Sequence, residues 1–163
     1  MESSASAGAV GRAVPAGRPP DVLLVCTANI CRSPMAEAMW RKAAAGRRRP
    51  LDVASAGLEA EPGRVADEAC VELMAVRGLD LSDHRATRFR VELAVDCELI
   101  LVMEPAHARR ILALAPQLSG RVQLLGRWGQ GAIADPYRRE AEAYVECIEL
   151  LENSIQAWLN KIP

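Results

Sequence analysis

The chain has 163 residues, of which half are apolar and a quarter are charged, and its 20 basic and 21 acidic residues leave a net charge of −1. This composition excludes a wholly disordered chain, and the near-zero net charge argues against a general nucleic-acid or membrane-surface binder. The longest apolar runs, VLLVC at 22–26 and LILVM at 99–103, are far too short to cross a bilayer.

The first twenty residues differ in composition from the rest of the chain. Residues 1–20 are rich in Ala, Gly, Pro and Ser and lack the apolar centre of a secretory signal. We expect them to form a flexible leader, with residues 21–163 folding as a single domain. Without a secretory signal, the five cysteines should stay reduced in the cytoplasm, and their odd number fits no disulfide framework.

The remainder of the chain alternates strand-like and helix-like segments. Strands are predicted over 22–26, 51–55, 97–103 and 122–125. Helices are predicted over 34–45, 65–77, 106–115 and 140–159. The first helix should start at Ser33-Pro34, an N-cap residue followed by proline at the first helical position. The last helix should bury a stripe that runs from Tyr144 to Trp158.

This alternation indicates an α/β fold. We expect a three-layer, doubly wound sandwich with a four-stranded, mostly parallel sheet and helices on both faces. In such sheets the ligand site lies beyond the carboxyl ends of the strands. The loop after the first strand, at 26–33, is therefore predicted to be the functional site.

That loop reads CTANICRS, with a cysteine leaving a buried strand and an arginine six positions later. Its successive backbone N–H groups and the following helix N-terminus can converge on one anion, and Arg32 can bind two phosphate oxygens. The same positive environment should lower the pKa of Cys26 and make it a nucleophile. Ser33 can donate a hydrogen bond to the sulfur, and Asn29 tolerates a left-handed backbone. The loop therefore predicts a phosphate-binding site with a thiolate nucleophile.

At this point the sequence resembles the low-molecular-weight protein tyrosine phosphatases. VCTANICRSPMAE looks like the family's signature, and the resemblance covers roughly residues 21–160 in the family's order. It continues through SAG at 55–57, GLDLSDHRAT at 78–87, LILVMEPAH at 99–107 and DPYRRE at 135–140. The segment APQLSGRVQLLGRWG before DPYRRE is most similar to the bacterial branch found with capsule and exopolysaccharide tyrosine kinases.

The resemblance implies catalytic roles for three residues. Cys26 would attack phosphorus and form a cysteinyl-phosphate, and Arg32 would hold the equatorial oxygens. Asp135 would protonate the leaving phenolate and then activate water. An Asp-Pro pair alone is more often a turn starter, so this role depends on its position after the fourth strand.

The resemblance also implies which residues surround the substrate. Ser55 and His84 match residues that support the loop in the family. Substrate-binding residues would be Thr27, Ala28, Asn29, Ile30, Cys31, Ser33, Leu58 and Tyr137. Ala28 replaces the family's usual glycine, so the backbone there must avoid a positive φ. The loop after SAG lacks the aromatic residue of eukaryotic members, which leaves substrate-ring contacts to Leu58, Ile30 and Tyr137.

Other polar residues have competing interpretations. Cys31 is either a small residue that fills the loop or a redox thiol that traps oxidised Cys26 as a reversible disulfide. Cys70, Cys97 and Cys147 are expected to be buried packing residues, and His107 an exposed residue near a helix start. Two histidines and scattered cysteines make no credible zinc site, so we expect no metal and no cofactor.

Three alternatives to a tyrosine phosphatase fit the sequence less well. Arsenate reductases of this fold carry further cysteines after the strand that matches 99–103, and residues 103–110 hold none. Phosphoarginine phosphatases carry threonine where Ile30 stands, and an apolar Ile30 suits a phenyl ring better. A non-catalytic phosphotyrosine-binding module would need neither the nucleophile Cys26 nor the acid Asp135.

The expected partners follow from the resemblance. The substrate would be a phosphotyrosine protein, specifically the tyrosine-rich tail of a membrane tyrosine kinase of exopolysaccharide synthesis, and inorganic phosphate would be the product. We expect no nucleic-acid partner and no membrane insertion. The protein should act in the cytoplasm.

Overall fold

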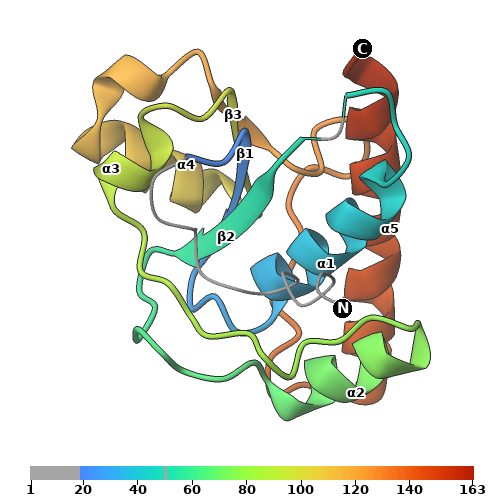
Figure 1. Cartoon of the computed structure of the whole chain (residues 1–163). Coiled ribbons are helices and arrows are strands. Elements are labelled where there is room, and N and C mark those ends of the chain that lie inside the picture. Colours follow the sequence, from blue (N-terminus) through green and yellow to red (C-terminus); the bar gives the residue numbers. More distant parts are fainter. Residues whose placement is uncertain (1–18, 50) are drawn as a thin grey trace, which may run out of the picture.

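The structure is a computed structural model that describes residues 19–49 and 51–163 (Figure 1). The predicted leader lies outside the described residues, apart from Pro19 and Pro20. Of the helices formed by the described residues, none is long and apolar enough to span a membrane.

Four parallel strands form the central sheet, in the order β2-β1-β3-β4. They are β1 (Val22–Cys26), β2 (Val53–Gly57), β3 (Leu99–Val102) and β4 (Val122–Leu124). The register pairs Cys26 with Gly57 at the carboxyl edge of the sheet. Because β1 lies between β2 and β3, the chain reverses its direction of winding beside β1, which is where parallel sheets bind ligands.

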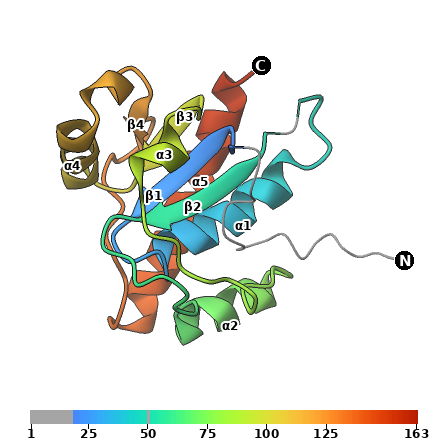
Figure 2. The same ribbon diagram turned by 60° about the vertical axis from the view of Figure 1, so that its left-hand side comes forward.

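Helices cover both faces of this sheet (Figures 1 and 2). One face carries α1 (Arg32–Ala44) and α5 (Ala141–Lys161), with α2 (Glu68–Val76) packed beside them. The other face carries α3 (Val91–Ala94) and α4 (Pro105–Leu114), followed by the short 3₁₀ helix η2 (Pro116–Leu118). The predicted three-layer, doubly wound sandwich is confirmed.

Alternate residues of β1 enter two separate apolar cores. Val22 and Leu24 pack with α1 and α5, whereas Leu23 and Val25 pack with α3 and α4. All four are 1% exposed or less. β1 is thus buried on both faces, as a central parallel strand requires, and the loop at its end starts from the most enclosed strand of the sheet.

Several element boundaries differ from those predicted. α1 begins at Arg32 with Cys31 as its N-cap residue, so the predicted start at Ser33-Pro34 is wrong. β2 lies two residues later than predicted, because its pairing with β1 extends to Gly57. The short α3 was not predicted, since four residues are too few to give a helical period.

The second helix begins at Glu68, three residues later than predicted. α2 begins after Asp67, whereas Val65 forms an isolated bridge with Arg85. Val65 and Val76, near the two ends of the predicted helix, are 57% and 86% exposed, and the buried residues of α2 are Cys70 and Met74. The helix thus turns Cys70 towards the core beside α1.

Candidate active site

The loop after β1 has a backbone shape that depends on two residues. Asn29 has a φ of 57°, in the left-handed region, as predicted for this residue type. Ala28 does not share that conformation: Asn29 and Arg138 are the positive-φ residues other than glycine in the described part of the chain. Gly57 lets the loop pass close to β2, because a Cβ there would lie 2.6 Å from the Thr27 carbonyl oxygen and 2.8 Å from the Asn29 nitrogen.

A chain of hydrogen bonds leads from the core to the Cys26 sulfur. Glu37, fully buried on α1, accepts a hydrogen bond of 2.6 Å from the Ser55 hydroxyl. The Asn29 amide donates one hydrogen to Ser55 (2.9 Å) and the other to Ser33 (2.7 Å). The Ser33 hydroxyl lies 2.9 Å from the Cys26 sulfur. Because Ser33 oxygen already accepts from Asn29, its own hydrogen is free to donate to that sulfur.

Asn29 is held by two further contacts from the segment after α2. The Thr87 backbone N–H donates to the Asn29 side-chain oxygen at 2.8 Å. The Asn29 carbonyl lies 2.7 Å from His84 Nε2, and since a carbonyl can only accept, Nε2 carries the hydrogen. The structure therefore places both predicted supporting residues, Ser55 and His84, against Asn29. Glu37 was missed, because a glutamate within a helical segment gives no sign of a distant partner.

The electrostatic balance at Cys26 differs from the one predicted. Burial raises the pKa of the Cys26 thiol, and this effect outweighs the Arg32 charge and the hydrogen bonds from Ser33 and from backbone N–H groups, which lower it. Only 3% of Cys26 is exposed, so the sulfur has lost most of its contact with water. The predicted net lowering is therefore wrong in this geometry. Formation of the Cys26 thiolate therefore depends on the groups that lower its pKa, namely Arg32 and the hydrogen bonds to the sulfur.

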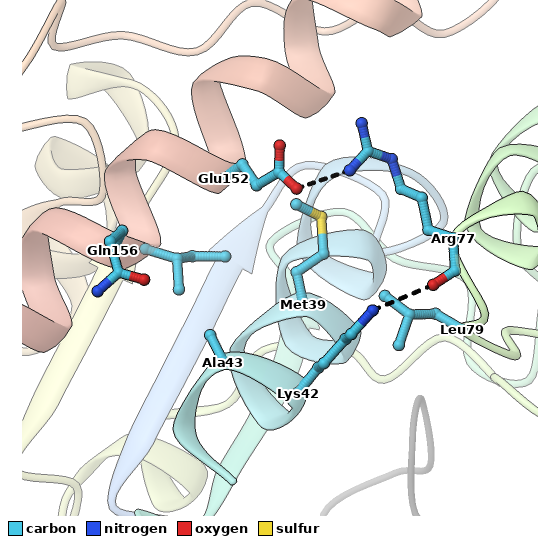
Figure 3. A pocket seen from close by; sticks show the side chains of 8 residues that line it. Met39, Lys42, Ala43, Arg77, Leu79, Glu152 and Gln156 are labelled. Atoms are coloured by element: carbon cyan, nitrogen blue, oxygen red, sulfur yellow. Dashed lines mark hydrogen bonds and ion pairs between the residues drawn. The ribbon is translucent and has the colours of Figure 1, made fainter. Parts of the chain in front are cut away.

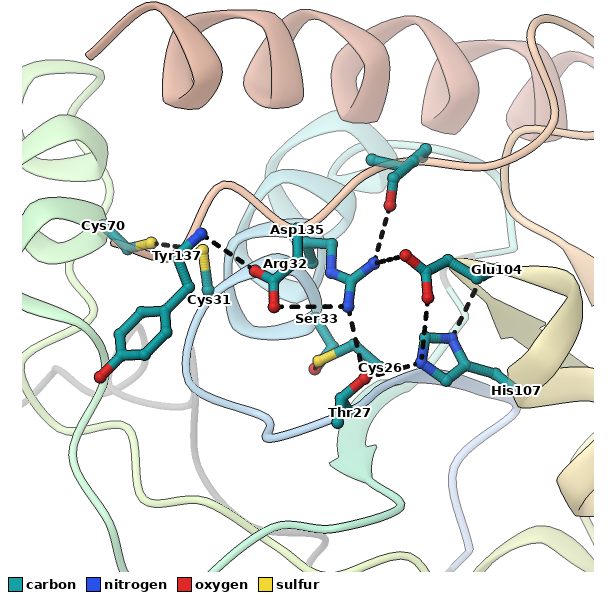
Figure 4. A network of polar contacts seen from close by, with 11 residues as sticks. Cys26, Thr27, Cys31, Arg32, Ser33, Cys70, Glu104, His107, Asp135 and Tyr137 are labelled. Atoms are coloured by element: carbon teal, nitrogen blue, oxygen red, sulfur yellow. Dashed lines mark hydrogen bonds and ion pairs between the residues drawn. The ribbon is translucent and has the colours of Figure 1, made fainter. Parts of the chain in front are cut away.

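Arg32 is buried at the start of α1, where several acceptors surround its guanidinium (Figure 4). One terminal nitrogen donates to the Glu104 carboxylate at 3.0 Å and to the Ile133 carbonyl at 2.7 Å. The other lies 3.4 Å from the Thr27 hydroxyl and 3.7 Å from the Asp135 carboxylate. This second nitrogen has the weaker contacts. It is therefore the guanidinium nitrogen that can most easily exchange its present partners for a bound anion.

His107 also belongs to the site, although the sequence indicated an exposed residue. It is 3% exposed, and with Glu104 it forms a capping box at the start of α4. Burial, followed by the Arg32 charge, lowers the pKa of His107, so its ring is neutral near pH 7. Nδ1 accepts from the Glu104 backbone N–H, so the ring hydrogen is on Nε2, 2.9 Å from the Thr27 hydroxyl. His107 and Glu104 thereby orient Thr27 and Arg32.

The acid candidate lies on an exposed segment before α5. The Asp135 side chain is 45% exposed, and its carboxylate accepts a 3.1 Å hydrogen bond from the Tyr137 backbone N–H. The Tyr137 ring packs with a small apolar group that includes Ile30, Ala60 and Ala86. Asp135 and Tyr137 thus reach the loop from a different part of the chain.

One pocket brings most of the predicted residues together. Its lining consists of Cys26, Ala28, Asn29, Ile30, Cys31, Arg32, Asp135 and Tyr137. Thr27 and Ser33 lie behind this lining in the hydrogen-bond network. Leu58 is not brought to it: its side chain packs with Leu23 and Val25 in the core beneath α3 and α4.

A larger cavity lies elsewhere and lacks comparable chemistry. It has a volume of about 330 Å³ and is bounded by α1, α5 and the end of α2 (Figure 3). Its polar contacts are an ion pair between Arg77 and Glu152 and a hydrogen bond from Lys42 to the Arg77 carbonyl. It contains neither a nucleophile nor a converging set of donors. We therefore place the candidate site at the loop, although the space there is only about 20 Å³.

Comparisons with known proteins agree with this geometry. The low molecular weight phosphotyrosine protein phosphatase family model matches residues 21–163. The chain is 41% identical over 141 residues to the probable low molecular weight protein-tyrosine-phosphatase EpsP of Ralstonia nicotianae, covering 86% of this chain and 94% of that protein.

Two solved structures have the same fold. The Erwinia amylovora tyrosine phosphatase AmsI is 36% identical with a TM-score of 0.80, over 90% of this chain and 95% of that one. Vibrio vulnificus Wzb in complex with benzylphosphonate is 36% identical with a TM-score of 0.80, over 86% and 97%. The chain therefore belongs to the low molecular weight phosphotyrosine protein phosphatase family and is a protein tyrosine phosphatase.

Proposed function

We propose that the chain hydrolyses phosphotyrosine through a cysteinyl-phosphate intermediate. The Cys26 sulfur attacks phosphorus, the bond from phosphorus to the phenolic oxygen breaks, and Asp135 gives its proton to that oxygen. Water then attacks the phosphorus, Asp135 takes a proton from it, and inorganic phosphate leaves as Cys26 is released. The observation that carries this proposal is the Ser33 hydroxyl, whose hydrogen can reach the Cys26 sulfur while Arg32 and Asp135 line the same pocket.

The loop and Arg32 would hold the phosphate during both steps. The phosphate is a dianion, and the backbone N–H groups at the start of α1 supply donors for its oxygens. The Arg32 nitrogen nearest Asp135 makes a 3.4 Å hydrogen bond to Thr27 and a 3.7 Å ion pair with Asp135, both of them long. A bound phosphate would take over this nitrogen and leave the Asp135 carboxyl free to meet the leaving oxygen.

The shape of the pocket mouth favours an aromatic leaving group. Ile30 and Tyr137 pack together with Ala60 and Ala86, which gives one side of the mouth an apolar wall. A phenyl ring can bury its face on this wall, whereas the guanidinium of phosphoarginine would lose hydration against it. This contact supports phosphotyrosine over phosphoarginine.

The physiological substrate proposed here is the phosphorylated, tyrosine-rich tail of a membrane tyrosine kinase of exopolysaccharide synthesis, and the protein would act on it in the cytoplasm. The similarity of residues 115–140 to the exopolysaccharide-associated branch supports this partner. A flexible tail can present a phosphotyrosine to a shallow pocket without a precise fit around it, because recognition depends on the phosphate and the ring.

Two assays test the proposal. Phosphotyrosine, phosphoserine and phosphoarginine peptides are compared as substrates in the presence of EDTA, and selective turnover of phosphotyrosine is expected. The phosphorylated kinase tail is then mixed with the wild-type protein or with Cys26→Ser, and phosphotyrosine is followed by mass spectrometry. Loss of phosphate with the wild-type protein alone is expected. If the tail stays phosphorylated while aryl phosphates are consumed, the kinase partner is wrong and the enzyme activity stands.

A further inference from the structure

Cys31, in the loop at 26–33, lies in contact with a cysteine of α2, Cys70. The sulfur atoms of Cys31 and Cys70 are 3.0 Å apart, in a hydrogen bond between two thiols (Figure 4). Cys31 is the N-cap residue of α1 and lines the pocket that holds Cys26, whereas Cys70 belongs to α2. Since a disulfide bond is about 2.05 Å long, a movement of about 1 Å separates this contact from a covalent link.

The surroundings hold the two sulfurs together from both sides. The Asp67 backbone N–H donates to the Ile30 carbonyl at 2.8 Å, which ties the start of α2 to the loop. The Asp67 carboxylate accepts a hydrogen bond from the Tyr144 hydroxyl at 2.7 Å and lies 3.6 Å from the Cys70 sulfur. Cys31 is 4% exposed and Cys70 is fully buried. The pair is thus a fixed feature of the contact between α2 and the loop.

We propose that Cys31 and Cys70 form a redox modification site, in which a hydroperoxide converts the two thiols to a disulfide. Cys31, which lines the pocket, attacks the peroxide, the O–O bond breaks, and a sulfenic acid forms with release of water. The Cys70 sulfur then attacks the Cys31 sulfur, the S–O bond breaks, and a second water leaves. With hydrogen peroxide, two thiols and one peroxide give one disulfide and two waters.

This disulfide differs from the Cys26–Cys31 pair that the sequence suggested. It leaves the catalytic thiol unmodified and acts on the loop instead, because Cys31 lies between Ile30 and Arg32 where the backbone donors bind phosphate. Drawing the Cys31 sulfur towards α2 would displace those donors. The oxidised protein should therefore bind phosphate poorly, and a dithiol reductant should restore binding. The inference goes beyond the proposed function, since it concerns how the loop is switched off.

The reaction is expected to be slow compared with that of an exposed thiol. The hydrogen bond with Cys70 and burial both raise the pKa of Cys31 above its ordinary value. Because the thiolate is the reacting form, the pair should respond to sustained exposure to peroxide and remain reduced during brief exposure.

The test uses Cys26→Ser, so that the catalytic thiol does not take part. This protein is treated with hydrogen peroxide in the presence of EDTA, digested without reduction, and mapped by mass spectrometry. A peptide pair linked through Cys31 and Cys70 is expected to accumulate with time. If both residues remain thiols, or if Cys31 goes on to sulfinic acid while Cys70 stays free, the proposal is overturned.

The consequence is measured as inorganic phosphate binding by calorimetry, which does not depend on catalysis. Oxidised Cys26→Ser should bind phosphate about tenfold or more weakly than the reduced protein, because small displacements of binding groups are costly, and dithiothreitol should reverse the loss. Cys26→Ser with Cys70→Ala should bind phosphate equally before and after peroxide. Cys26→Ser with Cys97→Ala is the matched control, since Cys97 is buried under the other face of the sheet, and it should still respond.

The wild-type protein distinguishes a Cys31–Cys70 disulfide from the Cys26–Cys31 disulfide that the sequence suggested. After the same treatment, the linked peptides should include the Cys31–Cys70 pair. If Cys31 is found linked to Cys26 and never to Cys70, the pair is not the redox site. If the untreated protein has no phosphatase activity, the proposed function fails and the redox proposal does not. The disulfide map and the phosphate affinity of Cys26→Ser are measured without turnover.

Discussion

Cys26 and Asp135 line the same pocket, but the two residues are held in different ways. Cys26 is 3% exposed and is reached by a chain of hydrogen bonds that passes through Ser33, Asn29 and Ser55. Asp135 is 45% exposed, and its side chain makes a hydrogen bond to its own segment and a 3.7 Å ion pair.

This difference indicates which side of the site can move. A buried polar group that loses its partner costs about 1–3 kcal/mol, so the groups behind Cys26 cannot rearrange separately. Only the Asp135 end of its ion pair with Arg32 is exposed to water, and the two atoms are 3.7 Å apart, so Asp135 can exchange partners more easily than the buried groups can. In the proposed mechanism, the loop at 26–33 would therefore act as a preformed cradle for the nucleophile Cys26, and Asp135 would be an acid whose carboxyl group changes its contact during the reaction.

Among variants that keep the nucleophile, the largest effect is expected from removing the acid on the mobile side. Asp135→Asn keeps the shape of the side chain but removes the proton that the leaving phenolate needs, so turnover should fall roughly 10²–10⁴-fold. The deficit should shrink for aryl phosphates with good leaving groups, measured as kcat across a leaving-group series. Glu140→Gln, an exposed acidic residue on the same segment, should be near wild type. A deficit that is independent of the leaving group would make Asp135 a structural residue.

The next effect comes from displacing the cradle without removing a functional group. A Cβ at Gly57 would lie well inside contact distance of the Thr27 and Asn29 backbone. Gly57→Ala should therefore lower kcat/KM by about 10²-fold, the scale of a 1 Å displacement. Gly120→Ala adds a methyl group where no atom lies within 4 Å and should have no effect. Equal activity of the two variants would show that the loop tolerates the shift.

A smaller effect should follow from removing one donor to the sulfur. Ser33→Ala removes a hydrogen bond that lowers the pKa of Cys26, so the raised pKa should rise further. Alkylation of Cys26 near pH 7 should become roughly tenfold slower or more, and its pH profile should move to higher pH. Ser119→Ala, at an exposed position, serves as the control. An unchanged profile would mean that Ser33 does not stabilise the thiolate.

The smallest effect concerns His107, which contacts the Thr27 hydroxyl of the loop. Its pKa is held below its ordinary value of 6.5, so the unfolded chain binds the proton more readily than the folded one. The stability that comes from neutral His107 is present above about pH 6.5 and is lost as the pH falls below it. Urea unfolding should show a smaller loss of the free energy of unfolding between pH 7 and 5 in His107→Asn than in the wild-type protein. Equal losses would contradict a neutral, buried His107.

Much of the fold was accessible from the sequence because parallel strands are continuous apolar runs. The apolar runs of β1 and β3 are sufficient to predict strands, and the long amphipathic stripe of α5 is sufficient to predict a helix. β2 was placed two residues too early, since its end is set by pairing with β1 rather than by its own composition. The start of α2 was wrong for a similar reason: Val65 forms a bridge with Arg85, a partner that the local composition does not reveal.

The residues of the site likewise include some that the sequence could predict and some that it could not. The loop residues are neighbours in sequence, so their convergence could be predicted. Glu37, Glu104 and His107 act across long sequence separations, and a single polar residue in a helical segment does not identify its partner. Leu58 was assigned to the pocket from its position after SAG, whereas the alternation of the strand directs it to the opposite core.

The central claim is that the buried thiol carries the phosphoryl group. During turnover of a phosphotyrosine peptide with labelled phosphate, acid quenching on the millisecond scale should trap phosphate on the peptide that contains Cys26, and Cys26→Ser should trap none while still binding inorganic phosphate. If the wild-type protein turns over substrate without any label on Cys26 at any quench time, or if Cys26→Ser remains active, the covalent mechanism is contradicted.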